Sequence, residues 1–283
     1  MKNQSVILIT GANSGFGLAC AKALAEKGHK VYGTYRNFKK AEPLFELSRS
    51  LPVFPIVMDV DRTPSVQKAV SLIFKKEGRI DVVINNAGFV MAGFLEDLSD
   101  EDLKAQFETN VIGILRVCRA VLPIMREQKS GKILNIGSVA GFASLPGLGA
   151  YSATKFSVNS ITEALRMETR PWGVEVSEVN PGEIQTSVVQ NARMGKKVMS
   201  PQSPYTPFTR QFEEVSKERF KKAAPVEKLV GVVLKALEDS PMKRRYLVKA
   251  DDYATYYLRW LLPDALWERG LGVMFPWSRF PKI

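Results

Sequence analysis

A glycine-rich turn directly follows the first apolar run of the chain and leads into a helix-length segment. Residues 6–10 form the apolar run, Gly11, Gly15 and Gly17 lie in the turn, and 18–27 has the composition of a helix. Glycine permits a tight turn, a close approach of the backbone to phosphate, and close packing of the next helix. A pyrophosphate would then lie at the amino terminus of that helix. This order predicts a dinucleotide-binding fold.

Short apolar runs alternate with amphipathic, helix-length segments along the rest of the chain. Such alternation predicts parallel strands joined by right-handed helical crossovers, with both faces of the sheet covered. The expected fold class is α/β, a doubly wound parallel sheet of the Rossmann type in a single domain. The strands are predicted at 6–10, 31–35, 53–58, 82–85, 133–137 and 174–179.

The composition is that of a globular protein and argues against several other classes. Hydrophobic residues make up 45% of the 283 residues and charged residues 24%. No run approaches the roughly 20 apolar residues needed to span a bilayer, so a cytoplasmic location is expected. The net charge of +11 is concentrated at 191–283, which carries +8, but no basic recognition module indicates a nucleic-acid partner. His29, Cys20 and Cys118 are too scattered to predict a metal site.

The C-terminal part of the chain differs in composition from the rest. We predict a dinucleotide-binding catalytic domain at 1–250, with a substrate loop at about 183–222 that includes the proline-rich segment 200–207. An aromatic, basic extension follows at 251–283, and eight aromatic residues lie within 253–280. Such a segment suits peripheral contact with a membrane surface. Packing over the pocket or against a partner subunit is the alternative that we favour.

The end of the second predicted strand indicates which dinucleotide binds. It reads Gly33-Thr34-Tyr35-Arg36 and contains no Asp or Glu. An acidic residue here would hydrogen-bond the 2′-hydroxyl of NAD, whereas Arg36 can bind a 2′-phosphate. We therefore expect NADP(H) as the cofactor.

A Tyr-x-x-x-Lys pattern occurs twice, and position separates the two copies. Tyr35 and Lys39 lie in the turn that selects the cofactor, whereas Tyr151 and Lys155 begin a predicted helix that follows Ser138. On a helix, Lys155 lies one turn from Tyr151 on the same face, where its ammonium favours a phenolate. Because tyrosine ordinarily has a pKa of about 10, this cation makes it a more usable acid and base. Ser138, at the carboxyl edge of the sheet, can hold a substrate carbonyl.

Together these motifs resemble the short-chain dehydrogenase/reductase family, in particular its hydroxysteroid and retinol dehydrogenase branch. The resemblance covers 5–190 and includes Asn85-Asn86-Ala87-Gly88, Asn110-Val111-Ile112-Gly113, Tyr151-Ser152-Ala153-Thr154-Lys155 and Pro181-Gly182. It implies that Tyr151 is the general acid/base and that Lys155 lowers its pKa and binds the nicotinamide ribose. It also implies that Ser138 orients the carbonyl and that Asn110 maintains a water-linked proton relay. Phe16 departs from the family, which commonly has a smaller aliphatic residue there.

The same resemblance implies where cofactor and substrate bind. The cofactor would contact Gly11, Asn13, Ser14, Gly15, Phe16, Gly17, Arg36, Asp59, Val60, Asn86, Ala87, Gly88, Tyr151, Lys155, Pro181, Gly182, Ile184 and Thr186. The substrate would contact Ser138, Phe89, Met91, Phe142, Leu145 and Tyr151. The apolar members of this set indicate a hydrophobic substrate, and each is equally compatible with a core position.

The sequence thus predicts an NADP(H)-dependent oxidoreductase that interconverts a hydrophobic alcohol, steroid-, retinoid- or lipid-like, with its ketone or aldehyde. Tyr151 would transfer the proton while hydride moves between nicotinamide and substrate. The resemblance also implies a homo-oligomer. The alternative is a catalytically silent dinucleotide-binding regulatory protein, which typically lacks part of the catalytic set. All four catalytic positions are filled in this chain.

Overall fold

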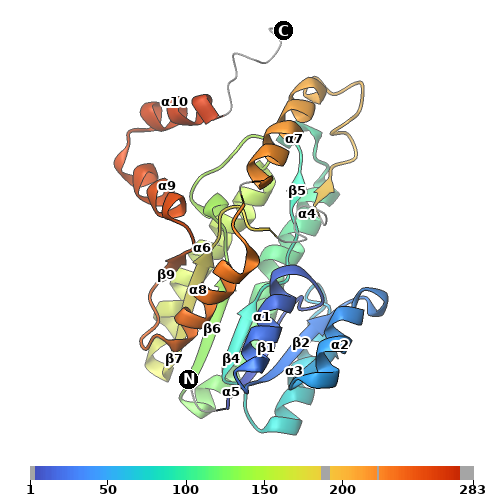
Figure 1. The fold of residues 1–283 in the computed structure, drawn as a ribbon, viewed down its shortest axis with the longest axis vertical. Coiled ribbons are helices and arrows are strands. Elements are labelled where there is room, and N and C mark those ends of the chain that lie inside the picture. The colour runs from blue at the N-terminus through green and yellow to red at the C-terminus, as the bar shows by residue number, and fades with distance from the viewer. Residues whose placement is uncertain (1–3, 186–191, 222, 275–283) are drawn as a thin grey trace.

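A seven-stranded parallel sheet forms the centre of the computed structural model, which describes residues 4–185, 192–221 and 223–274 (Figure 1). The strand order is β3-β2-β1-β4-β6-β7-β9. Every neighbouring pair is parallel, with Ile7 opposite Val31 on one side and Val82 on the other. The strands are β1 (Val6–Ile9), β2 (Lys30–Tyr35), β3 (Val53–Val57), β4 (Val82–Asn85), β6 (Gly131–Ile136), β7 (Val174–Asn180) and β9 (Arg245–Leu247).

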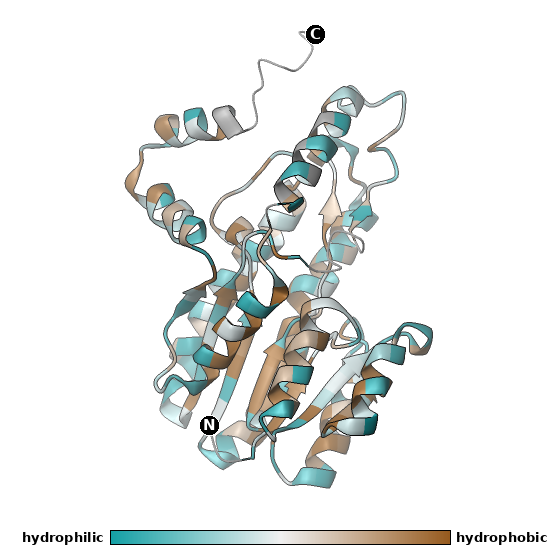
Figure 2. Ribbon diagram, in the orientation of Figure 1, coloured by the Kyte–Doolittle hydropathy of each residue, from teal (hydrophilic) through white to brown (hydrophobic). Residues whose placement is uncertain are grey.

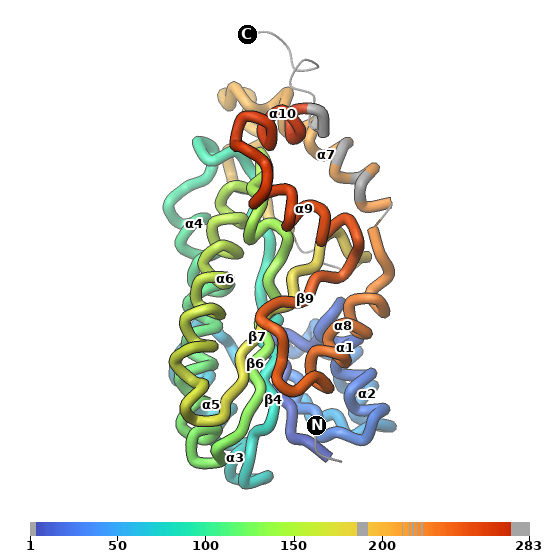
Figure 3. The backbone as a smooth tube through the Cα atoms, turned by 90° about the vertical axis from the view of Figure 1, so that its left-hand side faces the viewer, coloured from blue at the N-terminus to red at the C-terminus, as the bar shows by residue number. Residues whose placement is uncertain are grey.

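Helices cover both faces of this sheet (Figure 3). One face carries α1 (Gly15–Glu26), α2 (Glu42–Ser50) and α8 (Val226–Glu238), and the other carries α3 (Thr63–Glu77), α5 (Gly113–Gln128) and α6 (Gly149–Thr169). Along β1, Ile7 and Ile9 face the first set, and Val6 and Leu8 face the second. Strands buried on both faces read as continuous apolar runs, and the central strands are the most hydrophobic part of Figure 2. The predicted doubly wound Rossmann fold is confirmed.

The strand order changes direction between β1 and β4. The chain runs outward from β1 to β2 and β3, then returns across the sheet to β4 and continues to β6, β7 and β9. Open α/β sheets bind ligands at the carboxyl ends of their strands, beside such a switch point. The site is therefore expected at the carboxyl ends of β1 and β4.

Several shorter elements lie beyond this carboxyl edge (Figure 1). The two-residue strands β5 (Met91–Ala92) and β8 (Arg193–Met194) pair in parallel. The helices beyond the edge are α4 (Asp100–Phe107), α7 (Thr206–Lys221), α9 (Ala250–Leu261) and α10 (Asp264–Met274). None of the described helices has the length and apolar composition needed to cross a bilayer.

The six predicted strands are all present, whereas β5, β8 and β9 were missed. They are two or three residues long, too short for periodicity to reveal. The segment 200–207 was predicted to be loop, but α7 already begins at Thr206 and has Pro207 in its first turn. Proline is tolerated there because the first helical N–H groups have no partner within the helix.

Candidate active site

The glycine turn between β1 and α1 is fixed to the turn after β4. Thr10 Oγ1 accepts hydrogen bonds from the backbone N–H groups of Asn86 and Ala87, each at 2.9 Å. Asn86 Nδ2 donates to Thr10 O and Gly11 O, also at 2.9 Å. A Cβ at Gly17 would lie 2.5 Å from Asn86 Nδ2 and from Gly11 O, so a larger residue does not fit. The two turns therefore form one cradle.

This cradle fits the pyrophosphate of a dinucleotide. The N-cap residue of α1, Ser14, makes no side-chain hydrogen bond to the helix, and no acidic residue lies in the first turn. The positive end of the helix dipole and its N–H groups are therefore available to an anion. Phe16 is buried in the core, and Asn13 Nδ2 donates to Lys40 O at 3.2 Å. The larger Phe16 side chain thus points away from the ligand side of the turn.

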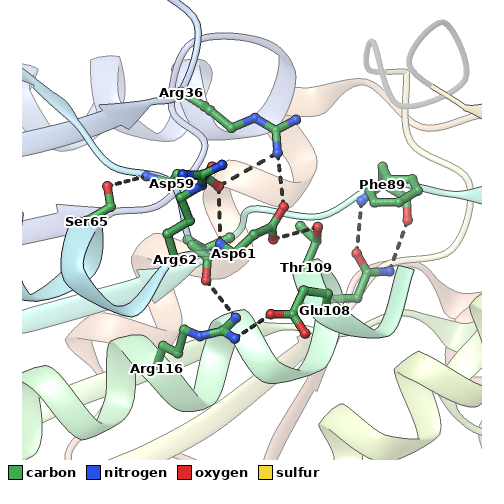
Figure 4. A network of polar contacts seen from close by, with 11 residues as sticks. Arg36, Asp59, Asp61, Arg62, Ser65, Phe89, Glu108, Thr109 and Arg116 are labelled. Atoms are coloured by element: carbon green, nitrogen blue, oxygen red, sulfur yellow. Dashed lines mark hydrogen bonds and ion pairs between the residues drawn. The ribbon is translucent and has the colours of Figure 1, made fainter. Parts of the chain in front are cut away.

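Arg36, directly after β2, lies among acidic side chains (Figure 4). Its Nη1 is 3.0 Å from Asp61 Oδ2 and 3.7 Å from Asp59 Oδ1. Asp61 accepts a hydrogen bond from Thr109 at 2.8 Å, and the Asp59 N–H donates to Ser65 Oγ at 2.9 Å. Because the Arg36 side chain is 54% exposed, a ligand can reach it. The structure thus brings Arg36 and Asp59 to one edge of the predicted cofactor site.

Val60, also predicted to contact the cofactor, is held by the start of α5. Arg116 Nη1 donates to Val60 O at 3.2 Å, and Arg116 also pairs with Glu108 (Figure 4). A Cβ at Gly113 would lie 3.0 Å from the Val60 side chain. These contacts hold the loop after β3 against α5.

Asn110 lies in a π-helical turn, η3 (Glu108–Ile112), between α4 and α5. Its side chain accepts a hydrogen bond from Phe89 N and donates to Phe89 O, both at 3.0 Å. It also donates to Thr154 Oγ1 at 3.2 Å, and Thr154 in turn donates to Tyr151 O. The Asn110 side chain therefore joins the loop after β4 to the helix of Tyr151. Single π turns of this kind are frequent at functional sites.

Tyr151 and Lys155 lie one turn apart on α6, beside Ser138 at the end of β6. Lys155 Nζ is 5.6 Å from the centroid of the Tyr151 ring and donates to Ile136 O at 2.7 Å. The hydroxyl groups of Ser138 and Tyr151 share a hydrogen bond. The three predicted residues are thus together at the carboxyl edge of the sheet.

Burial sets the protonation states of this pair. It raises the pKa of Tyr151 to about 12, and the hydrogen bond with Ser138 opposes the rise. It lowers the pKa of Lys155 to about 8, and the carboxyl of Glu178 opposes the fall. The resemblance implies that Lys155 lowers the Tyr151 pKa; in this structure burial is the largest influence on that pKa, and Ser138 is the group that opposes it. At neutral pH Tyr151 therefore keeps its proton and Lys155 keeps its charge.

The segment after β7, predicted to reach the nicotinamide, lies against the turn after β6. Pro181 O accepts a backbone hydrogen bond from that turn at 3.0 Å. Gly182 N donates to Asp252 Oδ2 at 3.3 Å, which connects this segment to α9. Ile184 is buried and forms a single parallel β-bridge with Ala224. Thr186 lies outside the described residues.

A cavity of about 740 Å³ lies beyond the start of α6. Most of its lining side chains are apolar, and its charged side chains are two glutamates, with no Lys or Arg among the described lining residues. Glu268 and Leu271 of α10 line the cavity, so the C-terminal extension forms one wall. The cavity is lined by Phe94, Leu95, Glu96, Ser144, Leu145, Pro146, Gly147, Gly149, Tyr205, Glu268 and Leu271.

The predicted substrate residues occupy different places. Leu145 lines the cavity, and so does Gly149, which precedes Tyr151 by two residues. Phe89 is half-buried, and Met91 is buried in a small apolar cluster. Phe142 is 2% exposed and packs edge-on against Tyr256 of α9, with ring centroids 5.1 Å apart. Phe142 and Met91 therefore lie in apolar clusters, not along this cavity.

Three residues without a role predicted from the sequence support the site. Glu178 is 1% exposed and acts electrostatically on Lys155. Asp252 accepts the Gly182 N–H, and Thr154 links Asn110 to α6. The signal for Glu178 was a charged residue within an otherwise buried strand, which is rare unless the charge is paired. Thr154 lies within the Tyr151–Lys155 motif but had no predicted role, and no local pattern indicated Asp252.

Comparison with known proteins identifies the family. The family model described as short chain dehydrogenase matches residues 5–197, which contain the glycine cradle and the Tyr151 site. The chain belongs to the short-chain dehydrogenase family. Members of this family are oxidoreductases that act on alcohol or keto groups with a nicotinamide dinucleotide. The residues of the cradle fit such a cofactor.

This short-chain dehydrogenase is similar to several curated proteins. It is 39% identical over 213 residues to a 3-ketodihydrosphingosine reductase of Bacteroides thetaiotaomicron, covering 75% of this chain and 76% of that one. It is 33% identical to human 17-beta-hydroxysteroid dehydrogenase type 1, covering 86% and 77%. It is 31% identical to an NADPH-dependent 3-dehydrocapnine reductase of Ornithobacterium rhinotracheale, covering 93% and 94%. The predicted resemblance to this family and its hydroxysteroid dehydrogenases is confirmed.

Solved structures of similar fold include complexes with both dinucleotides. A short-chain dehydrogenase/reductase from Burkholderia phymatum in complex with NAD superposes with a TM-score of 0.78, at 27% identity, covering 90% of this dehydrogenase and 92% of that chain. ElxO with NADP bound gives a TM-score of 0.73 at 25% identity, covering 88% and 99%. The fold alone therefore does not choose between NAD and NADP.

Proposed function

We propose that this dehydrogenase interconverts a hydrophobic alcohol and its ketone or aldehyde with NADP(H), and that Tyr151 is the general acid/base. The observation that carries the proposal is the convergence of Ser138, Tyr151 and Lys155 beside the glycine cradle. A bound nicotinamide dinucleotide supplies or accepts the hydride. The residues of the chain supply the proton and the charge that the reaction needs.

In the reductive direction, the roles follow from the protonation states of the three side chains. The Ser138 hydroxyl orients the substrate carbonyl, and Tyr151 donates its phenolic proton to the carbonyl oxygen as the carbon receives hydride. The O–H bond of Tyr151 breaks, a new O–H bond forms on the product, and the Lys155 ammonium stabilises the phenolate. Because the pKa of Tyr151 is raised to about 12, the phenol is protonated near neutral pH, as proton donation to a carbonyl requires.

The proposed preference for NADP(H) rests on the end of β2. Arg36 is exposed there, and no acidic side chain occupies the strand end that would bind a 2′-hydroxyl. Arg36 forms solvent-exposed ion pairs with Asp61 and Asp59, which water screens. A doubly charged 2′-phosphate can replace these carboxylates as the partner of Arg36. The names of the 3-dehydrocapnine reductase and of the ElxO complex, which mention NADPH and NADP, support the same choice.

The proposed substrate class rests on the cavity. Its apolar walls suit a steroid-, retinoid- or lipid-like molecule. Glu96 and Glu268 would repel a carboxylate or phosphate, so we propose a neutral or cationic substrate. The names of two relatives refer to 3-ketodihydrosphingosine and 3-dehydrocapnine.

We also propose two roles for the C-terminal extension. Its inner side lines the cavity through Glu268 and Leu271, which supports the pocket-covering alternative. Its outer side exposes Trp260 and Leu261, at 71% and 75%, and these suit a membrane surface. Flotation of the full chain with liposomes, compared with a chain truncated after Ala250, tests the second role. Failure of the full chain to float would exclude it.

A substrate panel tests the proposed activity. NADPH absorbance is followed with ketosteroids, retinals, long-chain ketones and simple aromatic ketones. Turnover of at least one hydrophobic carbonyl is expected. If the wild type turns over none of them yet binds NADPH, the alternative of a silent regulatory protein is favoured. Family members often form oligomers, so we further propose a homo-oligomer, which light scattering checks.

A further inference from the structure

Glu178 is a buried carboxylate next to the proposed catalytic residues. It lies on β7 and is 1% exposed. Its carboxyl occupies the space where a side chain at Gly137 would lie, directly behind the turn that carries Ser138. Asn180 Nδ2 donates to Glu178 Oε1 at 2.5 Å and to Ser138 O at 3.2 Å. The carboxylate is thus connected to the backbone of Ser138 through one side chain.

Cations face Glu178 from two elements. Lys155, from α6, donates to Ile136 O at 2.7 Å, and Ile136 directly precedes Gly137, which the Glu178 carboxyl contacts. Arg245 approaches from β9, with Nη2 3.9 Å from Glu178 Oε2. Arg244, just before Arg245, acts in the same direction from farther away. Burial raises the pKa of Glu178, and Asn180 and these cations offset only part of that rise. In the described part of the chain, the charged groups that act on Glu178 are all cations.

Among the described residues, Glu178 is the carboxylate that opposes the buried charges of Lys155 and Arg245, and its removal would leave both without it. Arginine does not lose its proton in proteins, so the lysine would respond. Burial already lowers the pKa of Lys155 to about 8, close to neutrality, and Glu178 is what opposes a further fall. An opposite charge at close range shifts a pKa by roughly one to three units. The ammonium that stabilises a Tyr151 phenolate therefore depends on Glu178.

We propose that Glu178 is a positioning residue: its carboxylate keeps Lys155 charged and, through Asn180, holds the turn that carries Ser138. This inference rests on the proposed function, in which Lys155 acts as a cation. It also explains a charged residue in the middle of a buried strand, where an apolar side chain would otherwise be expected.

The direct test is the titration of Lys155, followed by NMR of ¹³C-labelled lysine in the folded protein without added cofactor. The Lys155 signal is assigned by its loss in Lys155→Arg. In Glu178→Gln, which keeps the size and the hydrogen bond of the side chain, the titration midpoint should fall by about one pH unit. The control is Glu175→Gln, on the same strand, whose carboxylate accepts the Met242 N–H; it should leave the midpoint unchanged. An unchanged midpoint in Glu178→Gln overturns the proposal.

The pH profile of NADPH-dependent reduction gives a second readout. In Glu178→Gln, the fall in kcat/KM at alkaline pH should begin about one unit lower than in the wild type, and Glu178→Asp should restore part of the difference. A uniform loss at every pH, with thermal stability reduced, indicates a structural role only and also counts against the proposal. If the wild type shows no turnover but the NMR midpoint shifts, the proposed function fails while the role of Glu178 toward Lys155 stands.

Discussion

The two Tyr-x-x-x-Lys segments of this chain have the same spacing but different structures. Tyr35 is the last residue of β2, and Lys39 lies in a short 3-10 helix, η1 (Phe38–Lys40). The Tyr35 ring packs on Phe38 and Phe45, with centroid distances of 6.4 and 5.5 Å, and Lys39 is exposed. Tyrosine and lysine there serve packing and solvation.

Tyr151 and Lys155 instead share the helix α6. Both are placed by that helix against the end of β6, where Ser138 joins them. A spacing of four brings two side chains together only when both residues are helical. The Tyr-x-x-x-Lys spacing therefore brings the two side chains together only in the copy that one helix carries.

The largest effect should separate the two tyrosines. Tyr151→Phe removes the proton donor and should lower kcat/KM about 10³-fold, since general acid–base catalysis contributes about 10²- to 10⁴-fold. Tyr35→Phe removes only a hydroxyl from a packed ring and should change kcat/KM less than about threefold. Steady-state kinetics with NADPH and a good carbonyl substrate measure both. Full activity in Tyr151→Phe would refute the proposed mechanism.

The second-largest effect on kcat/KM should separate the two lysines. Lys155→Met removes the ammonium beside the phenolate and should lower kcat/KM about 10²-fold, whereas Lys39→Met should have little effect. Because the pKa of Lys155 is about 8, the wild type loses the ammonium as pH rises through that value, and its reductive kcat/KM should fall there. The methionine variant should lack this fall. A variant that keeps the fall near pH 8 would show that another group titrates.

The parts of the site that the sequence predicted are those with strong local signals. The strand, glycine turn and helix formed by 6–27 have glycines that the structure requires at Gly11 and Gly17, because backbone and Asn86 atoms fill the space. The six predicted strands are four to seven residues long, and the central strands β1 and β4 are mostly apolar and buried throughout. Such signals depend on residues near one another in the sequence, which is why they can be read from it.

The missing parts depend on contacts between distant segments. Glu178 contacts Gly137 only because β7 lies beside β6, and Asp252 meets Gly182 only because α9 returns to the sheet. The π-helical turn at Asn110 has no sequence signature of its own. Phe142, predicted to contact the substrate, packs against Tyr256, which lies more than a hundred residues later. The sequence contains no local signal for any of these contacts.

A substitution at Arg36, next to Tyr35, should have a smaller effect and tests whether this region selects the cofactor. Arg36→Asp removes the proposed partner of the 2′-phosphate and introduces a carboxylate that repels it. The ratio of kcat/KM for NADPH over NADH should fall about 10- to 100-fold, which corresponds to the loss of one or two charge-assisted hydrogen bonds. Arg62→Asp is the control, because Arg62 Nε lies 3.8 Å from Asp59 but is 80% exposed. An equal change in both variants would remove Arg36 from cofactor selection.

The smallest effect concerns whether the cavity beside α6 belongs to the Tyr151 region. Leu271 of α10 lines it, and Leu266 of the same helix does not and is 49% exposed. Leu271→Ala removes part of an apolar wall, worth about 1 kcal/mol, and should raise KM for a hydrophobic substrate about fivefold with little change in kcat. Leu266→Ala should leave KM unchanged. If the two variants behave alike, the substrate reaches Tyr151 by another route, and α10 has no part in binding it.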